Sequence, residues 1–116
     1  MSHELAKKRA VDIAQLLDVN KAEDVCVFDV AELTTVAEFF VISTGRNTRH
    51  LKALIRDVSD LIEEQDGNII GKEGTPESGW MLIDTGDIVV HVFEKSRREL
   101  YNLEVLWGDA EHISAL

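Results

Sequence analysis

The chain has 116 residues, a hydrophobic share of 45% and a formal net charge of -10, with 12 Lys and Arg against 22 Asp and Glu. This length and composition are typical of a single globular domain over residues 1–116, and they exclude a disordered or fibrous protein. Such an acidic surface repels phosphate backbones, so we expect little direct nucleic-acid contact and a basic protein as partner.

The sequence contains one cysteine and no long apolar stretch. Cys26 cannot form an intrachain disulfide, and its place in the apolar run 25–28 predicts a buried thiol. No segment reaches the roughly 18 apolar residues of a membrane-spanning helix, and the first residues lack the apolar core of a signal peptide. We therefore expect a cytoplasmic protein that makes no use of a membrane.

The first half of the chain predicts two helices and two strands. Apolar residues at helical spacing indicate a helix over residues 2–18, and the β-branched run 25–30 indicates a strand. A second strand covers 39–44 and ends at Gly45. Asn47 or Thr48 can cap the next helix, which runs to about Gln65.

The second half predicts a short strand over 69–73, a loop over 74–79, a β-hairpin over 80–93, a helix over 95–106 and a polar tail. The strand–helix–strand unit over 39–73 predicts a right-handed crossover between parallel strands, to which the hairpin adds antiparallel ones. The order α-β-β-α-β-β-β-α therefore predicts an α/β fold with a mixed sheet and flanking helices.

The hairpin divides into two faces because side chains alternate along a strand. With a four-residue loop over 84–87, Ile83 faces Ile88 and Met81 faces Val90, which gives an aliphatic face that packs on helices. The opposite face carries a mixture of aromatic, acidic and aliphatic side chains: Trp80, Leu82, Asp84, Asp87, Val89, His91 and Phe93. Such a mixture is typical of binding hot spots. It equally fits a core surface that the last helix covers, and periodicity leaves both interpretations open.

Residues that could carry chemistry do not form a recognisable set. The four histidines and Cys26 show no metal-ligand spacing, so we expect no metal site. Asp84 and Asp87 resemble a carboxylate pair, but they straddle a glycine turn, where acids are common for local reasons. The turn 43–48 precedes a helix and could hold a phosphate, yet it has one glycine and no Walker lysine. We expect no catalytic residue and no cofactor.

Four strings in order resemble one family, the ribosomal silencing factors, also called Iojap proteins. They are Glu38–Gly45 followed by Arg49-His50, then Trp80–Phe93, Arg98–Glu104 and Leu106–Ala110. The likeness runs from the first helix to Ala110. Family members more often have Asp-Tyr-Phe where this chain has Glu38-Phe39-Phe40, which removes one hydroxyl and puts any polar role of that aromatic in doubt.

The resemblance implies a nucleotidyltransferase-like α/β domain without the active site. It also implies binding to large-ribosomal-subunit protein fourteen on the face that meets the small subunit. Binding there would block subunit joining and lower translation under nutrient limitation. We expect the contact to be made by seven residues, Trp80, Leu82, Asp84, His91, Phe93, Arg98 and Tyr101.

Two other functions remain open at this point. The chain could be a homo-oligomeric interaction protein whose apolar hairpin face makes a homodimer. It could also be a residual metal-dependent nucleotidyltransferase or hydrolase that uses Asp84 and Asp87.

Overall fold

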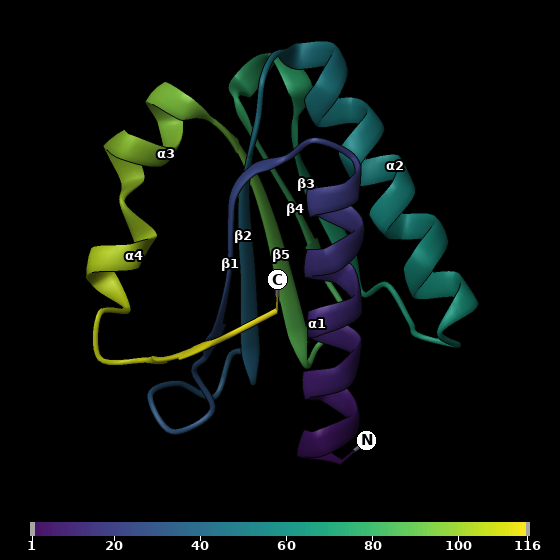
Figure 1. The fold of residues 1–116 in the computed structure, drawn as a ribbon, viewed down its shortest axis with the longest axis vertical. Helices are drawn as coiled ribbons and strands as arrows, with labels where there is room; N and C mark the ends of the chain where they lie inside the picture. Colours follow the sequence, from purple (N-terminus) through teal and green to yellow (C-terminus); the bar gives the residue numbers. More distant parts are fainter. Residues whose placement is uncertain (1, 116) are drawn as a thin grey trace.

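The computed structural model describes residues 2–115, which form one six-stranded mixed sheet flanked by helices (Figure 1). The predicted α/β fold class is confirmed. The molecule measures 34 × 31 × 26 Å along its principal axes. In chain order the elements are α1 His3–Val19, β1 Glu23–Asp29, β2 Phe39–Gly45, α2 Thr48–Glu64, β3 Gly71–Thr75, η1 Pro76–Ser78, β4 Trp80–Asp84, β5 Ile88–Glu94, α3 Lys95–Tyr101, α4 Leu103–Leu106 and β6 Glu111–Ile113.

The sheet has the strand order β3-β4-β5-β2-β1-β6. Among the strands of residues 2–115, only β2 and β5 pair in parallel, and all other neighbours pair antiparallel. The two strands of the crossover predicted over 39–73, β2 and β3, do run parallel in one sheet, but they are not neighbours, because β5 and β4 lie between them. The physical reason is that β2 is buried along its whole length and needs a partner as apolar as β5, whereas β3 is mostly exposed and suits an edge.

Two apolar cores lie on opposite faces of the sheet. The larger contains the buried faces of α1 and α2, which both cover one side of the sheet (Figure 1). The smaller lies on the other side, where Leu103 and Trp107 of the segment around α4 pack against sheet residues such as Phe40 and Phe93. A sheet covered on both faces buries β2 along its whole length and β5 up to Phe93, as their long apolar runs require.

Side-chain caps fix the starts of the two long helices. Ser2 accepts a hydrogen bond from the Leu5 backbone N–H at 3.1 Å, and Asn47 accepts one from the His50 backbone N–H at 2.8 Å. Each cap satisfies a backbone donor that the first helical turn leaves free. The predicted Asn47 cap and the predicted bounds of both helices are confirmed to within two residues.

The C-terminal part differs from the prediction. The helix expected over 95–106 is two short helices, because Asn102 adopts a left-handed conformation with φ 48° between them. The expected polar tail forms β6, which pairs antiparallel with β1 through Val27 and Ile113. The strand expected over 69–73 begins and ends two residues later.

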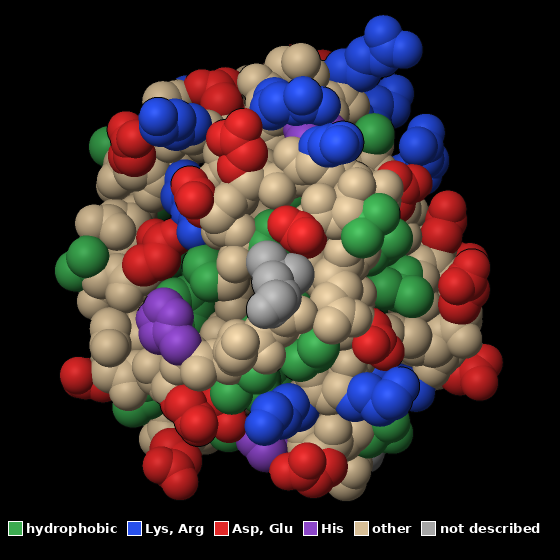
Figure 2. Space-filling view, in the orientation of Figure 1, with side chains coloured by type: hydrophobic (Ala, Val, Ile, Leu, Met, Phe, Trp, Pro, Cys, Tyr) green, Lys and Arg blue, Asp and Glu red, His purple; other side chains and the backbone are tan. Residues whose placement is uncertain are grey.

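Charges are unevenly distributed over the surface that Figure 2 displays. Lys and Arg gather along the upper edge, above the start of α2, while Asp and Glu are spread over the flanks (Figure 2). Within residues 2–115, no helix is long and apolar enough to cross a membrane.

Candidate partner-binding surface

The hairpin of β4 and β5 has the two faces that its sequence predicts. Ile83, Ile88, Val90 and Val92 are buried in the core beneath α1 and α2. Trp80, Leu82, Val89 and Phe93 belong to the core on the opposite side of the sheet. The division into an aliphatic face and a mixed face is therefore confirmed.

The register of the hairpin is offset from the predicted one by two residues. Ile83 faces Val90 and Met81 faces Val92, and the last pair before the turn is Asp84 with Val89. The Thr85 backbone N–H donates to the Ile88 carbonyl at 2.9 Å, and the Gly86 backbone N–H donates to the Asp84 carboxylate at 2.7 Å. An even offset keeps each side chain on its own face.

Aromatic rings cover much of the mixed face. The Trp80 ring lies 5.1 Å from the Phe93 ring and 4.5 Å from the Tyr101 ring, measured between centroids. Tyr101 comes from the end of α3, so α3 brings a fourth aromatic group to Trp80, His91 and Phe93. Stacked and tilted rings at these separations attract each other beyond their buried area, which makes the layer a rigid platform.

Exposure separates the seven predicted contact residues into two groups. Tyr101 has 47% of its surface exposed, and Trp80, Leu82 and Asp84 are half-buried. Phe93 is only 1% exposed and His91 only 6%. The direct contact predicted for Phe93 and His91 is therefore revised to a supporting position, because Trp80 and the last helices cover their rings.

A hydrogen bond from Trp80 to the more deeply buried His91 fixes the position of the indole ring. The Trp80 indole N–H donates to His91 Nδ1 at 3.1 Å, which leaves the proton of the neutral imidazole on Nε2. His91 Nε2 is buried without a hydrogen-bond partner among residues 2–115. Burial lowers the pKa of His91 to about 4, so the ring is neutral at physiological pH. Its Nδ1 can therefore accept the hydrogen bond from the indole N–H.

A shallow groove of about 240 Å³ lies in front of this platform. Its apolar part comes from Trp80, Leu82 and Tyr101, and its polar part comes from Ser78 and Glu73. Partly exposed Trp and Tyr side chains around a groove are the groups that dominate binding energy at protein interfaces. The groove is open and holds no set of reactive groups, so its chemistry suits binding.

The seventh predicted residue, Arg98, points away from this groove. Its side chain is 12% exposed and donates to Glu104 at 2.5 Å and to Thr44 at 2.9 Å. Cys26, expected to be fully buried, is half-buried and receives a third contact from Arg98 at 3.1 Å. Arg98 thus contacts β1, β2 and α4 and does not line the groove.

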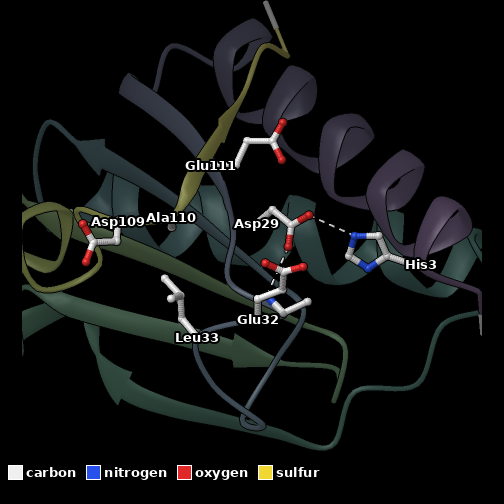
Figure 3. Close-up of a pocket in the computed structure, with 8 residues that line it drawn as sticks. His3, Asp29, Glu32, Leu33, Asp109, Ala110 and Glu111 are labelled. Atoms are coloured by element: carbon white, nitrogen blue, oxygen red, sulfur yellow. Dashed lines mark hydrogen bonds and ion pairs between the residues drawn. The ribbon is translucent and has the colours of Figure 1, made fainter.

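A hollow larger than this groove lies elsewhere, between the start of α1, the end of β1 and the start of β6 (Figure 3). It has a volume of about 400 Å³, and its lining includes His3, Asp29 and Glu111. His3 Nδ1 lies 2.6 Å from Glu38 and its Nε2 lies 2.9 Å from Asp29. Hydrogen bonds to these two carboxylates raise the pKa of His3.

Sequence reasoning missed this arrangement, because His3 is 26 residues from Asp29 and 35 from Glu38. No local spacing relates such distant positions, and only the packing of α1 brings them together. Within residues 2–115, no group of three or more His, Cys, Asp or Glu side chains could hold a metal ion. The hollow is an acidic recess without a metal-binding geometry.

The other sequence-derived candidates have structural roles. Asp84 accepts the Gly86 backbone N–H, and the Asp87 carbonyl accepts from the Glu38 and Phe39 backbones. The Asp84 carboxylate therefore shapes the turn, whereas the Asp87 backbone joins the turn to the start of β2. At the start of α2, the Asn47 side chain occupies the place that a phosphate would take beside the His50 backbone N–H.

Comparison with known proteins gives a consistent result. The family model described as "Ribosomal silencing factor during starvation" matches residues 3–116. The ribosomal silencing factor of Bacillus subtilis is 40% identical over 97 residues, which cover 84% of this chain and 82% of that protein. The chloroplastic Iojap protein of Arabidopsis thaliana is 35% identical over 104 residues, which cover 90% of this chain and 43% of that longer protein.

Solved structures agree with these sequences. A crystal structure of a protein from Chromobacterium violaceum superposes with a TM-score of 0.82 at 33% identity and covers 93% of this chain and 88% of its own. One from Bacillus halodurans superposes with a TM-score of 0.76 at 34% identity and covers 97% and 99%. The chain therefore belongs to the ribosomal silencing factor family.

Proposed function

We propose that this protein represses translation by binding large-ribosomal-subunit protein fourteen and sterically blocking the joining of the small subunit. The observation that carries the proposal is the groove formed by Trp80, Leu82 and Tyr101. It rests on a rigid aromatic layer, so little conformational entropy is lost when a partner binds there. In keeping with its family, the protein would act in the cytoplasm on ribosomes when nutrients are scarce.

The charge of the protein supports a protein partner over ribosomal RNA. A net charge of -10 disfavours close contact with phosphates and favours a basic protein surface. Asp84 stands at the end of β4 beside Leu82 and can pair with a basic side chain at the rim of the contact. A rim charge of this kind mainly sets the association rate and the choice of partner.

Blocking the joining of the subunits requires a body of sufficient size and no chemical reaction. The body measures 34 × 31 × 26 Å, which is large compared with the side-chain contacts that join two subunits. A protein of this size on the joining face would keep the subunits apart as long as it stays bound. We accordingly propose that the protein is not an enzyme and works without a cofactor.

A pull-down with the isolated ribosomal protein tests the contact surface. Tyr101→Ala and Trp80→Ala should each weaken binding, by about 2 kcal/mol or more for the tryptophan. Trp107→Ala is the matched control, because Trp107 packs against Phe40 in the same core and does not line the groove. Circular dichroism checks that each variant is folded. Undiminished binding by folded Trp80→Ala and Tyr101→Ala would contradict the proposed surface.

A homodimer is a second proposal. The aliphatic hairpin face expected to form it is buried beneath α1 and α2, so the proposal moves to another surface, which one observation favours. Leu100, Val105 and Leu106 expose 67%, 72% and 69% of their surfaces, a concentration of apolar area on two short helices. Light scattering with and without the ribosomal protein tests the proposal. A dimer that dissociates on binding would place self-association and ribosome binding on overlapping surfaces, and a monomer at all concentrations would rule the dimer out.

A further inference from the structure

The two last helices are attached to the sheet by few contacts. We call residues 95–106 the elbow. Neither α3 nor α4 contains a fully buried residue, and neither has a side-chain hydrogen bond at its N-cap. Asn102 turns the chain between them with φ 48°. Because such short helices are marginal on their own, the position of the elbow depends on specific tertiary contacts.

Arg98 makes the most extensive of these contacts. Its Nε donates to Glu104 of α4 at 2.5 Å, its Nη1 to Thr44 of β2 at 2.9 Å, and its Nη2 to Cys26 of β1 at 3.1 Å. One guanidinium group therefore joins α3 to α4 and to two strands. A planar fork with three occupied nitrogens fixes both distance and orientation, which a lysine ammonium cannot do.

The same helix carries Tyr101 to the aromatic platform. Residues three apart lie on adjacent positions of a helix surface, so the fixing of Arg98 also fixes Tyr101. The Tyr101 ring lies 4.5 Å from the Trp80 ring and 6.3 Å from the Phe93 ring. We infer that Arg98 is a positioning residue that holds the elbow on the sheet and thereby sets Tyr101 beside Trp80. This inference rests on the proposed function, because it concerns the surface that we propose for the partner.

The geometry separates this role from direct contact with a partner. The Arg98 side chain is 12% exposed, and the guanidinium is already bonded to three groups of the protein itself. A partner that recruited it would have to break these bonds and would leave the Glu104 carboxylate, 29% exposed, without its cation. Arg98 therefore acts through Tyr101.

Cys26 provides a reporter of the elbow position that needs no partner. It is the single cysteine of the chain, and Arg98 lies directly against its sulfur. Burial raises the pKa of the Cys26 thiol, and the neighbouring Arg98 charge opposes that rise. Loss of the charge alone would therefore slow the reaction of the thiol with a disulfide reagent, because the thiolate is the reactive form. Release of the elbow would uncover the sulfur and speed the reaction.

The first experiment measures the rate at which a chromogenic aromatic disulfide labels Cys26 in the folded protein. Cys26 should be labelled several-fold faster in Arg98→Met than in the wild type, and its labelling rate in Arg98→Lys should lie between the two. Arg97→Met is the matched control, since Arg97 is an exposed arginine one residue away on α3, and it should label like the wild type. Unchanged or slower labelling of Arg98→Met, or wild-type labelling of Arg98→Lys, would overturn the inference. If Arg98→Met does not fold, Arg98→Lys carries the test.

The second experiment measures binding to the isolated ribosomal protein for single and double variants. Arg98→Met should weaken binding about tenfold, and adding Arg98→Met to Tyr101→Ala should cause no further loss, because both act through the same contact. Additive losses would mean that Arg98 contacts the partner independently, and the positioning role would be wrong. Wild-type binding by Trp80→Ala, together with fast labelling of Cys26 in Arg98→Met, would refute the proposed partner-binding surface. The inference that Arg98 holds the elbow on the sheet would still be supported.

Discussion

Acidification should destabilise this protein through His91. The ring is buried and neutral, it accepts the Trp80 indole N–H, and its pKa falls from 6.5 in the unfolded chain to about 4 in the folded protein. The unfolded state therefore binds a proton more readily than the folded state. The resulting stabilisation is complete above pH 6.5 and is lost as the pH falls toward 4.

The size of the loss in stability follows from the shift in the pKa of His91. Between about pH 7.5 and pH 4.5, the unfolded chain gains its proton while most of the folded protein does not, which costs about 2.5 kcal/mol of folding free energy. A glutamine at position 91 can accept the same indole proton through its carbonyl and does not titrate. His91→Gln should therefore lose about 2.5 kcal/mol less than the wild type over the same range.

Urea unfolding followed by far-ultraviolet circular dichroism at several pH values measures this difference. The probe avoids tryptophan fluorescence, because Trp80 is bonded to the residue that changes. Carboxylate titrations contribute equally to both proteins and cancel in the difference. If the unfolding free energies of the wild type and His91→Gln change in parallel with pH, the reasoning is refuted. An NMR titration that gives His91 a pKa near 6.5 in the folded protein would refute it as well.

Three further predictions concern the rest of the structure. His3→Gln should remove a stabilisation that is present below pH 6.5 and lost as the pH rises through the raised pKa of His3, so thermal melts at pH 6 and pH 8 should differ less than in the wild type. Ile83→Ala should lower the unfolding free energy in urea by about 2–5 kcal/mol, since Ile83 is fully buried; a loss below about 1 kcal/mol would contradict its core position. Gly74→Ala should destabilise by more than about 1 kcal/mol, because Gly74 has φ 84° and a Cβ there would lie 2.0 Å from the Trp80 carbonyl oxygen; a melting temperature equal to that of the wild type would argue against this geometry.

Features with a short sequence period were predictable. The two faces of the hairpin follow from alternation alone, and they are the same for the predicted and the observed loop because the offset between the two is even. The start of α2 follows from Asn47, whose side chain can cap only the helix that comes after it. Both features depend on residues a few positions apart.

Features set by packing between distant segments were not predictable. The three residues of β6 show no strand pattern, and they pair with β1 only because the elbow returns the chain to that edge. The burial of His91 and Phe93 depends on the rings and helices that cover the mixed face, which periodicity left undecided. His3 meets Asp29 and Glu38 for the same reason, through the placement of a whole helix.

A ribosome profile on a sucrose gradient tests the central claim most directly. Purified small and large subunits are mixed under joining conditions with the wild type, with Trp80→Ala or with the Trp107→Ala control. The wild type and the control should migrate with free large subunits and reduce the peak of joined ribosomes, while Trp80→Ala should do neither. Joined ribosomes at an undiminished level with saturating wild-type protein, or equal blocking by folded Trp80→Ala, would contradict the account.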